Sequence, residues 1–354
     1  MNFKNIIFFL LKILSFPIAI VYGCIVHIRN FLFDKKILHS TSFNLPIICV
    51  GNIAVGGTGK TPMTEYLIKL LSQNSRIATI SRGYRRKTKG FFPANNKTTN
   101  DEIGDEPMQF HSKFPNVNVC VGEDRVNAVR QLLNLKPDIK TIILDDALQH
   151  RKIAAGLNIL LTDFTQPFYK DYFLPTGTLR DQRCSAKRAD MIVVTKCPAD
   201  LSNDDRAKIT NYINPTNQDV FFTAIKYGNP YHISNSEEFI LNNSTHYLLV
   251  HGIANATALR NYIASFDKNF DEIKFADHHH YTVSDIQKIV AAYQANSKKT
   301  IIITTEKDAV KLKTFANALS KVPVYLLPME IFFLFNEQEK FDNSIKNFVS
   351  QFNK

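Results

Sequence analysis

The segment "IAVGGTGKTP" runs from Ile53 to Pro62 and decides the fold. It follows the pattern G-x-x-x-x-G-K-[ST], a loop whose backbone N–H groups surround a phosphate, except that Ala54 occupies the first glycine position. The apolar run "PIICV" (46–50) precedes it and predicts a buried strand. The run "PMTEYLIKLL" (62–71) follows and predicts a helix with proline in its first turn. Because this order places a phosphate at a helix N-terminus, the segment predicts a nucleotide-binding loop rather than a tight turn alone.

The predicted loop gives its residues distinct roles. Lys60 would reach the β- and γ-phosphates of the nucleotide, and Thr61 would bind Mg²⁺. Gly56 and Gly57 leave the backbone free to turn its N–H groups towards an anion. The expected nucleotide-binding residues are Ala54, Val55, Gly56, Gly57, Thr58, Gly59, Lys60 and Thr61.

Two carboxylates end a second apolar run, "TIILDDALQH" (141–150). In a phosphate-loop fold this strand end carries the acid on the Mg²⁺ side, so Asp145 and Asp146 are the expected metal ligands. Successive side chains of a strand point to opposite faces, and both acids can face the metal only if the strand has ended there. The alternative is a helix cap followed by an exposed acid.

Strand-like apolar runs alternate with helical patterns, which predicts a doubly wound, mostly parallel α/β sheet of the phosphate-loop NTPase type. The expected strands lie near 47–50, 77–80, 117–121, 141–144, 158–161, 191–194 and 220–223. A polar stretch at 227–239 dilutes the pattern, and a second series of runs predicts a smaller α/β domain; these runs lie at 246–253, 272–282, 300–308 and 322–328. We therefore expect a hydrophobic N-terminal helix at 1–38, a phosphate-loop core domain at 39–230 and a smaller C-terminal domain at 231–354.

Composition limits the class of protein. The 354 residues suggest two domains, and a hydrophobic content of 45% is ordinary for a globular chain. The five cysteines are scattered without a C-x-x-C pair, which argues for a reducing compartment and against a disulfide framework. A formal net charge of +11 favours an anionic partner such as nucleic acid, anionic lipid or a phosphorylated substrate.

The first forty residues predict contact with a membrane. The stretch 6–36 is rich in Phe, Ile and Leu, is interrupted by Lys12 and ends in basic residues, and Pro17 should kink it. Its uninterrupted apolar part, 13–26, is shorter than the span of about 20 residues that crosses a bilayer. No small-residue cleavage site marks it as a signal peptide. We expect a basic-flanked interfacial helix; a single-span anchor and a buried core helix are the alternatives.

Three polar segments remain open on residue chemistry alone. The basic run "SRGYRRKTKG" (81–90) lacks the interleaved aromatic residues of a nucleic-acid site, so a phosphorylated substrate or lipid headgroup is the better fit. The stretch "NNKTTNDEIGDEP" (95–107) predicts a mobile loop before a helix that Asp105 would cap. The three histidines of "ADHHHYT" (276–282) fit a metal cluster, an exposed run or a proton-transfer pair with a carboxylate.

Taken together, these motifs resemble those of the tetraacyldisaccharide 4'-kinase family, the lipid A 4'-kinases. The resemblance spans 50–312 and rests on "VGNIAVGGTGKTP", "SRGY", "GDEP", "DDALQH", "LPTGTLRD", "ADHHHYT" and "TTEKDAVKL", in family order. The chain departs from the family pattern at three positions. Ala147 and Arg85 each replace a glycine, and Asp181 replaces a glutamate.

The resemblance implies a membrane-associated kinase on the cytoplasmic face of the bacterial inner membrane. Such an enzyme uses ATP and Mg²⁺ to phosphorylate the 4'-hydroxyl of the lipid A disaccharide 1-phosphate, giving lipid IVA. Asp105 would act with His278 to take the hydroxyl proton, and Lys60 would complete the catalytic set. The expected substrate-binding residues are Arg82, Tyr84, Arg85, Gln149 and His150. We expect a membrane lipid surface and no nucleic acid as partners.

Two rival functions follow from the same loop. One is a phosphate-loop kinase for another amphipathic acceptor. The other is a membrane-tethered protein that hydrolyses ATP to switch partners. A switch needs no base for an acceptor hydroxyl, so a working pair of Asp105 and His278 separates the kinases from the switch.

Overall fold

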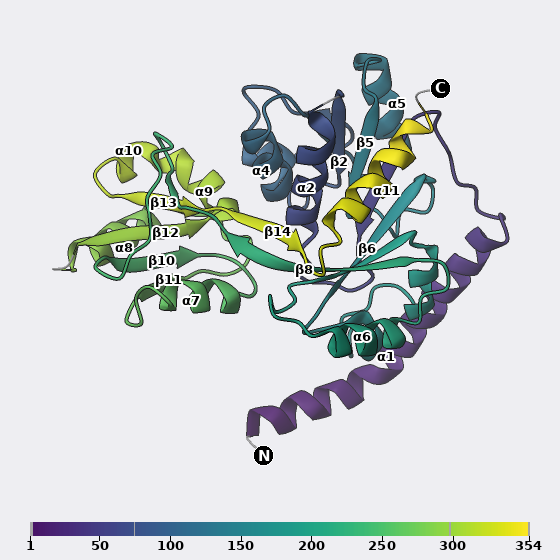
Figure 1. Cartoon of the computed structure of the whole chain (residues 1–354), viewed down its shortest axis with the longest axis horizontal. Coiled ribbons are helices and arrows are strands. Elements are labelled where there is room, and N and C mark those ends of the chain that lie inside the picture. The colour runs from purple at the N-terminus through teal and green to yellow at the C-terminus, as the bar shows by residue number, and fades with distance from the viewer. Residues whose placement is uncertain (1–2, 74, 297–298, 353–354) are drawn as a thin grey trace.

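The structure is a computed structural model that describes residues 3–73, 75–296 and 299–352, with the side chains of the first helix from Leu14 onward. Its strands form two sheets. A large sheet carries the phosphate loop, and a five-stranded sheet forms the second unit. Figure 1 shows the two units side by side, with the pair β8 and β14 running between them.

The larger sheet has the order β14-β8-β7-β6-β1-β5-β2-β4-β3 and is parallel except at β3 and β14. Its strands are β1 (Ile47–Gly51), β2 (Ile77–Ser81), β3 (Phe92–Pro93), β4 (Asn118–Val121), β5 (Thr141–Asp145), β6 (Leu157–Asp163), β7 (Met191–Thr195), β8 (Asp219–Tyr227) and β14 (Met329–Phe333). Each of β1, β2, β5 and β7 is buried along its whole length. A parallel sheet covered on both faces needs such continuous apolar runs, so the doubly wound sheet is confirmed.

Helices cover both faces of this sheet. They are α2 (Lys60–Ser72), α3 (Asn100–Ile103), α4 (Asp105–Lys113), α5 (Arg125–Leu135), α6 (Asn203–Ile213) and α11 (Gln338–Ser350), with short 3-10 turns η1 (Phe168–Lys170) and η2 (Arg183–Arg188). Successive side chains of β1 point to opposite faces of the sheet, and each face has its own core. Ile48 and Val50 pack with α2, α4 and α11, whereas Ile47 and Cys49 pack with α5. The carboxyl ends of β1 and β5 are thereby fixed at one edge of the sheet.

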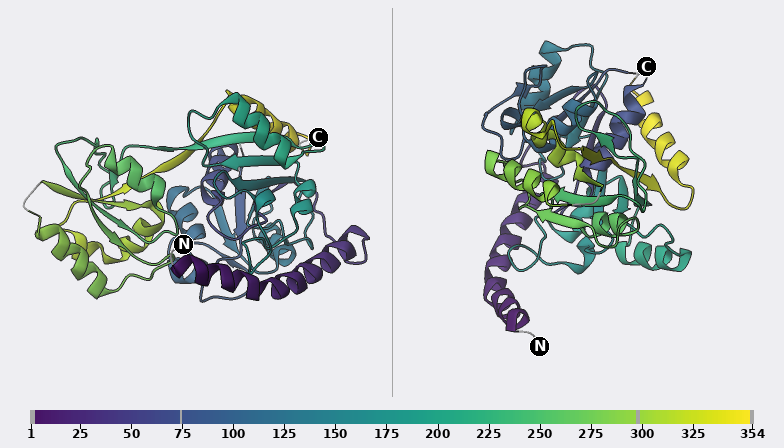
Figure 2. Two further views of the ribbon diagram at one scale, coloured as in Figure 1. Left: turned by 90° about the horizontal axis from the view of Figure 1, so that it is seen from below. Right: turned by 90° about the vertical axis from the view of Figure 1, so that its left-hand side faces the viewer.

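The smaller sheet has the order β11-β10-β12-β13-β9 and is parallel except at β9. Its strands are β9 (Tyr231–His232), β10 (His246–His251), β11 (Asp271–Lys274), β12 (Thr300–Thr305) and β13 (Val324–Leu327). Its helices are α7 (Thr257–Ala264), α8 (Val283–Gln294), α9 (Glu306–Leu312) and α10 (Ala316–Leu319), with the 3-10 turn η3 (Lys313–Phe315). Figure 2 shows this second unit from two further directions.

The end of the chain returns to the larger sheet. Strand β14 pairs antiparallel with β8, and Phe341 and Ile345 of α11 are buried in the same core as Ile48. The domain boundary near residue 230 stays a prediction. The sheets place β14 and α11, residues 329–350, with the larger unit, so we now assign 231–328 to the smaller unit. No charge or composition change marks this return in the sequence.

Helix α1 (Phe3–Asp34) runs as one helix through Pro17, and its N-terminal end projects from the larger unit (Figures 1 and 2). Ala19, Val26 and Phe33 are buried against the protein. Large apolar side chains on the remaining surface are 48–74% exposed: Leu14, Phe16, Ile18, Ile20, Val21, Ile25, Ile28 and Phe31. By length and composition 14–34 could cross a membrane, with only 28% of its apolar window buried.

Candidate active site

The phosphate loop connects β1 to α2 and contains two left-handed glycines. Gly56 has φ 113°, and Gly59 has φ 82° and is the residue immediately before α2. Any residue other than glycine at position 59 would have a strained backbone, and its Cβ atom would lie 3.5 Å from the side chain of Thr195. Helix α2 begins at Lys60, so its free N–H groups face the loop. This is the arrangement that the sequence predicted for an anion site.

Neighbouring side chains fix the loop from below. Asn52 is fully buried, and its Nδ2 donates to Thr58 Oγ1 at 2.7 Å. The Oγ1 of Thr195 donates to the carbonyl of Thr58 at 2.9 Å, and Lys196 Nζ donates to the carbonyl of Gly57. The loop is therefore held in one conformation before any nucleotide arrives, which lowers the entropy cost of binding.

The two adjacent aspartates both face helix α2. Strand β5 ends at Asp145, and Asp146 adopts a left-handed conformation with φ 52°. Because the strand ends there, the alternation of side chains no longer applies. Asp145 Oδ1 accepts a hydrogen bond of 3.3 Å from Thr64, and Asp146 Oδ2 lies 3.9 Å from Lys60 Nζ. The sequence analysis required the strand to end at these acids if both were to face one metal ion, and the strand does end there.

Asp145 has the properties of a carboxylate that needs a cation. It is 2% exposed, and the hydrogen bond that it accepts from Thr64 is long, at 3.3 Å. Burial, together with the charges of Glu106 and Asp146, raises the pKa of Asp145 to about 7. A divalent cation would offset these effects. Mg²⁺ is typically held by one or two carboxylates together with phosphates and water, and this pair fits that set.

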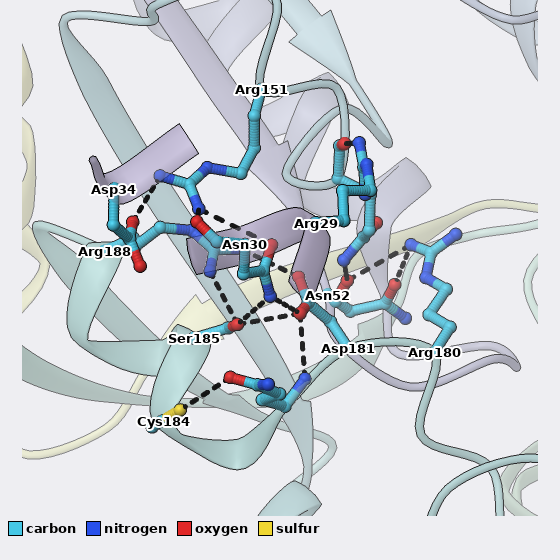
Figure 3. A network of polar contacts seen from close by, with 12 residues as sticks. Arg29, Asn30, Asp34, Asn52, Arg151, Arg180, Asp181, Cys184, Ser185 and Arg188 are labelled. Carbon is cyan, nitrogen blue, oxygen red and sulfur yellow. Dashed lines mark hydrogen bonds and ion pairs between the residues drawn. The ribbon is translucent and has the colours of Figure 1, made fainter. Parts of the chain in front are cut away.

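Arg180 belongs to the site although the sequence analysis assigned it no role. Its Nη2 donates to the carbonyl of Asn52 at 3.2 Å and makes a further short contact with the Asn52 side chain (Figure 3). Its Nη1 donates to Asp146 Oδ2 at 3.1 Å, and its Nη2 makes a short contact with Asp146 Oδ1. The pKa of Asp146 is lowered: burial alone would raise it, but Lys60 and Arg180 outweigh burial. The signal available in the sequence was the "LPTGTLRD" motif that contains Arg180.

The segment after Arg180 attaches helix α1 to the site. Asp181 is 1% exposed and accepts from Asn30 of α1 at 2.7 Å, from Ser185 at 2.8 Å and from Arg188 at 2.7 Å (Figure 3). Asn30 is itself buried. Asp181, which replaces the glutamate of the family pattern, is thus hydrogen-bonded to three neighbouring side chains. One of them belongs to α1, so α1 is joined to the segment whose Arg180 contacts Asp146.

The second half of the site pairs residues from the two units. His278 Nδ1 lies 2.9 Å from Asp105 Oδ2, although the two residues are 173 positions apart. Asp105 is the first residue of α4, with Gly104 before it as the cap, so the prediction that Asp105 caps the helix was wrong by one position. The predicted mobile loop contains α3, whose start is fixed by a capping box at Thr99.

Asp105 is held in its charged form. Its Oδ1 accepts from Asn100 Nδ2 at 2.8 Å, and its Oδ2 accepts from His278 and from Lys311 Nζ at 3.2 Å. Burial alone would raise the pKa of Asp105, but the hydrogen bonds from His278 and Asn100 and the charge of Lys311 hold it well below the usual range. The imidazole and carboxylate form a coupled pair that can accept a proton from a hydroxyl.

The histidine run itself divides into separate roles. His279 Nε2 pairs with Asp285 at 3.0 Å, inside the second unit, and only His278 reaches Asp105. Within the described ranges, no group of three or more His, Cys, Asp or Glu side chains is placed to hold a metal ion.

A small pocket opens beside the pair. The ring of Tyr84 meets that of His278 edge to face, with centroids 5.2 Å apart, and Arg85 lies over the Tyr84 ring at 5.5 Å. The pocket is lined by Tyr84, Arg85, Asn100, Gly104, Asp105, His278 and His280. Residues of the "SRGY" and "GDEP" motifs therefore line the same pocket as His278.

The basic run after β2 is less free than its sequence suggests. Arg86 pairs with Glu123 at 2.6 Å and Lys87 with Asp101 at 2.5 Å, whereas Arg82 and Arg85 are exposed. Arg85 adopts φ 60°, a left-handed conformation that favours glycine, which explains why the family pattern has glycine there. Ala147, the other glycine replacement, is buried in the core beneath the acids.

The remaining predicted substrate residues lie behind the loop. Gln149 Nε2 donates to the carbonyl of Asn52 at 2.9 Å, and its own carbonyl accepts from Arg29 of α1. His150 is half-buried; burial, together with the charges of Arg125, Arg82 and Arg29, lowers its pKa to about 4. His150 and Arg82 thus belong to a strongly positive region, which suits an anionic group of a ligand.

The two halves of the site lie against each other. Gln109 of α4 donates to Glu65 of α2 at 2.8 Å, and Glu106 is near enough to raise the pKa of Asp145. The helix that starts with Asp105 therefore packs beside the helix that starts with Lys60. A phosphate at the loop and a hydroxyl at the pair would be neighbours.

Comparisons with known proteins agree with this geometry. A family profile described as tetraacyldisaccharide-1-P 4'-kinase matches residues 11–350. A tetraacyldisaccharide 4'-kinase of Flavobacterium johnsoniae is 46% identical, over 97% of this chain and 98% of that protein. One of Bacteroides thetaiotaomicron is 41% identical, over 95% and 93%. The crystal structure of LpxK from Aquifex aeolicus in complex with ATP has a TM-score of 0.73 at 27% identity and covers 96% of this chain and 99% of that one.

Proposed function

The chain belongs to the tetraacyldisaccharide 4'-kinase family, and on that premise we propose which of its residues carry out the reaction. The protein is an ATP-dependent phosphotransferase of lipid A biosynthesis. It transfers the γ-phosphate of ATP to the 4'-hydroxyl of the tetraacyldisaccharide 1-phosphate and produces lipid IVA. Membership over nearly the whole chain sets aside the rival functions, a kinase of another acceptor and a partner-switching ATPase.

The observation that carries the assignment of roles is the contact between Asp105 and His278 beside the helix of the phosphate loop. The oxygen of the 4'-hydroxyl attacks the γ-phosphorus, and its proton passes to the pair. The bond between the γ-phosphorus and the bridging oxygen breaks, and ADP leaves with the electron pair. Since a sugar hydroxyl is a weak nucleophile, a positioned base should lower the barrier.

The loop residues act on the charge that develops during transfer. Lys60 neutralises charge on the transferred group, and the backbone of 54–61 surrounds the phosphates. Asp145, Asp146 and Thr61 would hold Mg²⁺, which would supply positive charge beside the phosphates. Arg180 keeps Asp146 ionised and oriented through its contacts with Asp146 and Asn52.

The acceptor would enter through the pocket beside Tyr84 and Arg85. Tyr84 offers an aromatic face to a sugar ring, and the exposed guanidinium of Arg82 suits a phosphate. Gln149 and His150 would contribute to acceptor binding from the segment after β5, where Gln149 is hydrogen-bonded to the carbonyl of Asn52. The positive surroundings of His150 favour an anionic acceptor.

Helix α1 would hold the enzyme at the membrane that contains this acceptor. Its exposed apolar side chains and basic flanks suit the boundary between headgroups and acyl chains. Its other side is bonded to Asp181, next to Arg180. The proposed location is the cytoplasmic face of the bacterial inner membrane, where ATP and the lipid substrate are both present.

Transfer of labelled phosphate tests this function. Purified protein is given γ-labelled ATP with tetraacyldisaccharide 1-phosphate in mixed micelles, and the position of the new phosphate on the product is identified. We expect label at the 4'-position and little ATP turnover without lipid. Turnover of ATP that does not depend on the acceptor would contradict the proposal.

A further inference from the structure

Helix α9 presents two lysines to the pair of Asp105 and His278. The helix begins directly after β12, with Thr305 as its cap. Lys307 and Lys311 are four residues apart, so they lie on the same face of the helix. Both belong to the "TTEKDAVKL" segment, to which the sequence analysis gave no role.

Lys311 contacts the carboxylate of Asp105. Its Nζ lies 3.2 Å from Asp105 Oδ2, the oxygen that also meets His278, and 3.8 Å from Asp308 Oδ1. The lysine is only 5% exposed, so water screens this interaction weakly. Since a buried ammonium is costly unless paired, its location beside Asp105 links the charge states of the two groups.

Lys307 contacts the other side of the imidazole. Its Nζ lies 3.2 Å from His278 Nε2 and 2.9 Å from Asp277 Oδ1. An ammonium group can donate hydrogen bonds but cannot accept one. The bond to Lys307 therefore requires Nε2 to be the acceptor, which leaves the ring proton on Nδ1, the atom that faces Asp105.

Helix α9 is itself held against the larger unit. Glu306, its first residue, is joined to Lys113 at the end of α4, at 2.5 Å. Helix α4 begins with Asp105, so both ends of α4 are bonded to α9. The two lysines are thus fixed relative to the carboxylate and are not mobile surface charges.

We propose that Lys311 and Lys307 are positioning residues for phosphate transfer: Lys311 orients the carboxylate of Asp105, and Lys307 selects the form of His278 that carries its proton on Nδ1. This proposal rests on the proposed function of the pair as the base. Together the lysines fix the protonation pattern and the geometry of the pair, without touching the substrate themselves.

The arrangement has a consequence for pH dependence. A cation beside the pair disfavours the form that has taken up a proton, so removal of the cation lets the pair keep its proton to higher pH. The described groups that face the pair are Lys311 and Lys307 of α9, Asp277, His280 and Tyr281 of the loop after β11, Asn100 of α3, and Tyr84 and Arg85 of the pocket. The acidic limb of the kcat profile should therefore move to higher pH when Lys311 loses its charge.

The experiment compares kcat against pH for the full-length wild type, Lys311→Met, Lys311→Arg and Lys313→Met. Saturating ATP, Mg²⁺ and tetraacyldisaccharide 1-phosphate are used throughout. For Lys311→Met we expect about a tenfold lower kcat near neutral pH and an acidic limb about one pH unit higher. Lys311→Arg restores the limb. Lys313, exposed and just beyond α9, is the control whose change leaves the profile as in the wild type.

An acidic limb that stays in place in Lys311→Met would overturn the proposal for Lys311, even if kcat falls, because a merely structural loss lowers kcat at every pH.

A second readout needs no substrate. Nitrogen-15 NMR of His278 should show Nδ1 protonated and Nε2 unprotonated in the wild type and a mixture of both forms in Lys307→Met. Identical ring-nitrogen shifts in the two proteins would overturn the proposal for Lys307.

These two readouts separate the inference from the proposed function. If the wild type transfers no phosphate to the lipid, the proposed function fails, and the histidine spectra still decide what Lys307 does. If Lys311→Met does not fold, Lys311→Gln, which keeps a donor without the charge, gives the same pH comparison. A wild-type limb in a folded Lys311→Gln contradicts the electrostatic role.

Discussion

Lys113 joins three parts of the site by ion pairs, and Lys113→Met measures how much the site depends on them. Its Nζ lies 2.7 Å from Glu65 on α2 and 2.5 Å from Glu306 on α9. The side chains are 19%, 5% and 9% exposed, respectively. One lysine thus connects the helix of the phosphate loop, the helix of Asp105 and the second unit.

The expected cost follows from leaving two carboxylates buried without their cation. Breaking a buried ion pair by removing one partner costs about 3–5 kcal/mol. Two features favour the lower end, about 3 kcal/mol. Lys113 keeps some exposure, and burial and Glu306 already raise the pKa of Glu65 to about 7, so that Glu65 can take up a proton when Lys113 is lost. At about 2–4 °C per kcal/mol, the melting temperature should fall by roughly 6–12 °C.

Thermal unfolding at pH 7.5 provides the assay, with Lys69→Met as the matched control. Lys69 also pairs with a glutamate, Glu330, but the two side chains are 44% and 55% exposed. An exposed pair contributes at most about 1 kcal/mol, so the control should melt within a few degrees of the wild type. The double variant Lys113→Met/Glu306→Gln should recover part of the loss because it removes one unpaired charge. Equal melting temperatures for Lys113→Met and Lys69→Met would refute the reasoning.

Three further predictions concern other parts of the chain. Lys60→Ala and Thr61→Ala should each lower phosphate transfer by about 10²–10³ because each removes a preorganised contact to the reacting phosphates, and near-normal turnover in folded protein would exclude the assigned roles. Replacing the exposed Ile18 and Ile25 of α1 with serine should lower binding to anionic vesicles at least about tenfold without changing the melting temperature, as cosedimentation and calorimetry would show; unchanged vesicle binding would leave α1 a structural helix only. Because the folded-state pKa of Glu65 is raised to about 7 from 4.5, its stabilising contribution is complete below pH 4.5 and is lost as the pH rises through about 7. The melting temperature of Glu65→Gln should therefore gain on that of the wild type between pH 5 and pH 8, and a constant difference would show that Glu65 does not titrate there.

Local patterns in the sequence were sufficient for the nucleotide half of the site. The segment from Ala54 to Thr61 leads from its strand into the first turn of its helix as predicted, because strand, glycine turn and helix are each specified by neighbouring residues. The end of β5 at Asp145 was also visible as an apolar run that stops at two acids. What the run did not reveal is the left-handed turn at Asp146, which brings both acids to one side.

The other half depends on contacts between distant residues, which spacing does not encode. His278 meets Asp105 because α9 and α4 pack together across the two units, and that packing arises from buried pairs such as Glu306 with Lys113. The resemblance to the family supplied this pair before the structure did. The resemblance included the "LPTGTLRD" motif, but neither source gave a role to its Arg180, whose guanidinium donates to Asp146.

The structure also changes how the N-terminal helix should be tested. Deletion of 1–38 would remove the proposed membrane contact, but it would also remove Asn30, which is 3% exposed and bonded to Asp181. Loss of that buried partner would leave Asp181 short of a donor and disturb the segment that holds Arg180. Substitutions on the exposed side of α1 separate membrane binding from folding, which a deletion does not.

A double-mutant cycle on Asp105 and His278 tests the central claim most directly, namely that two residues from different units act as one base for a lipid-borne hydroxyl. The measured quantity is kcat for phosphate transfer to tetraacyldisaccharide 1-phosphate, with the affinity for ATP and Mg²⁺ measured in parallel. Asp105→Ala and His278→Ala should each lower kcat by about 10²–10⁴ with nearly unchanged nucleotide affinity. Groups that act as a unit are not additive, so the double variant should be little worse than the poorer single one. Fully additive losses in log kcat would show that the two residues act independently and would contradict the account.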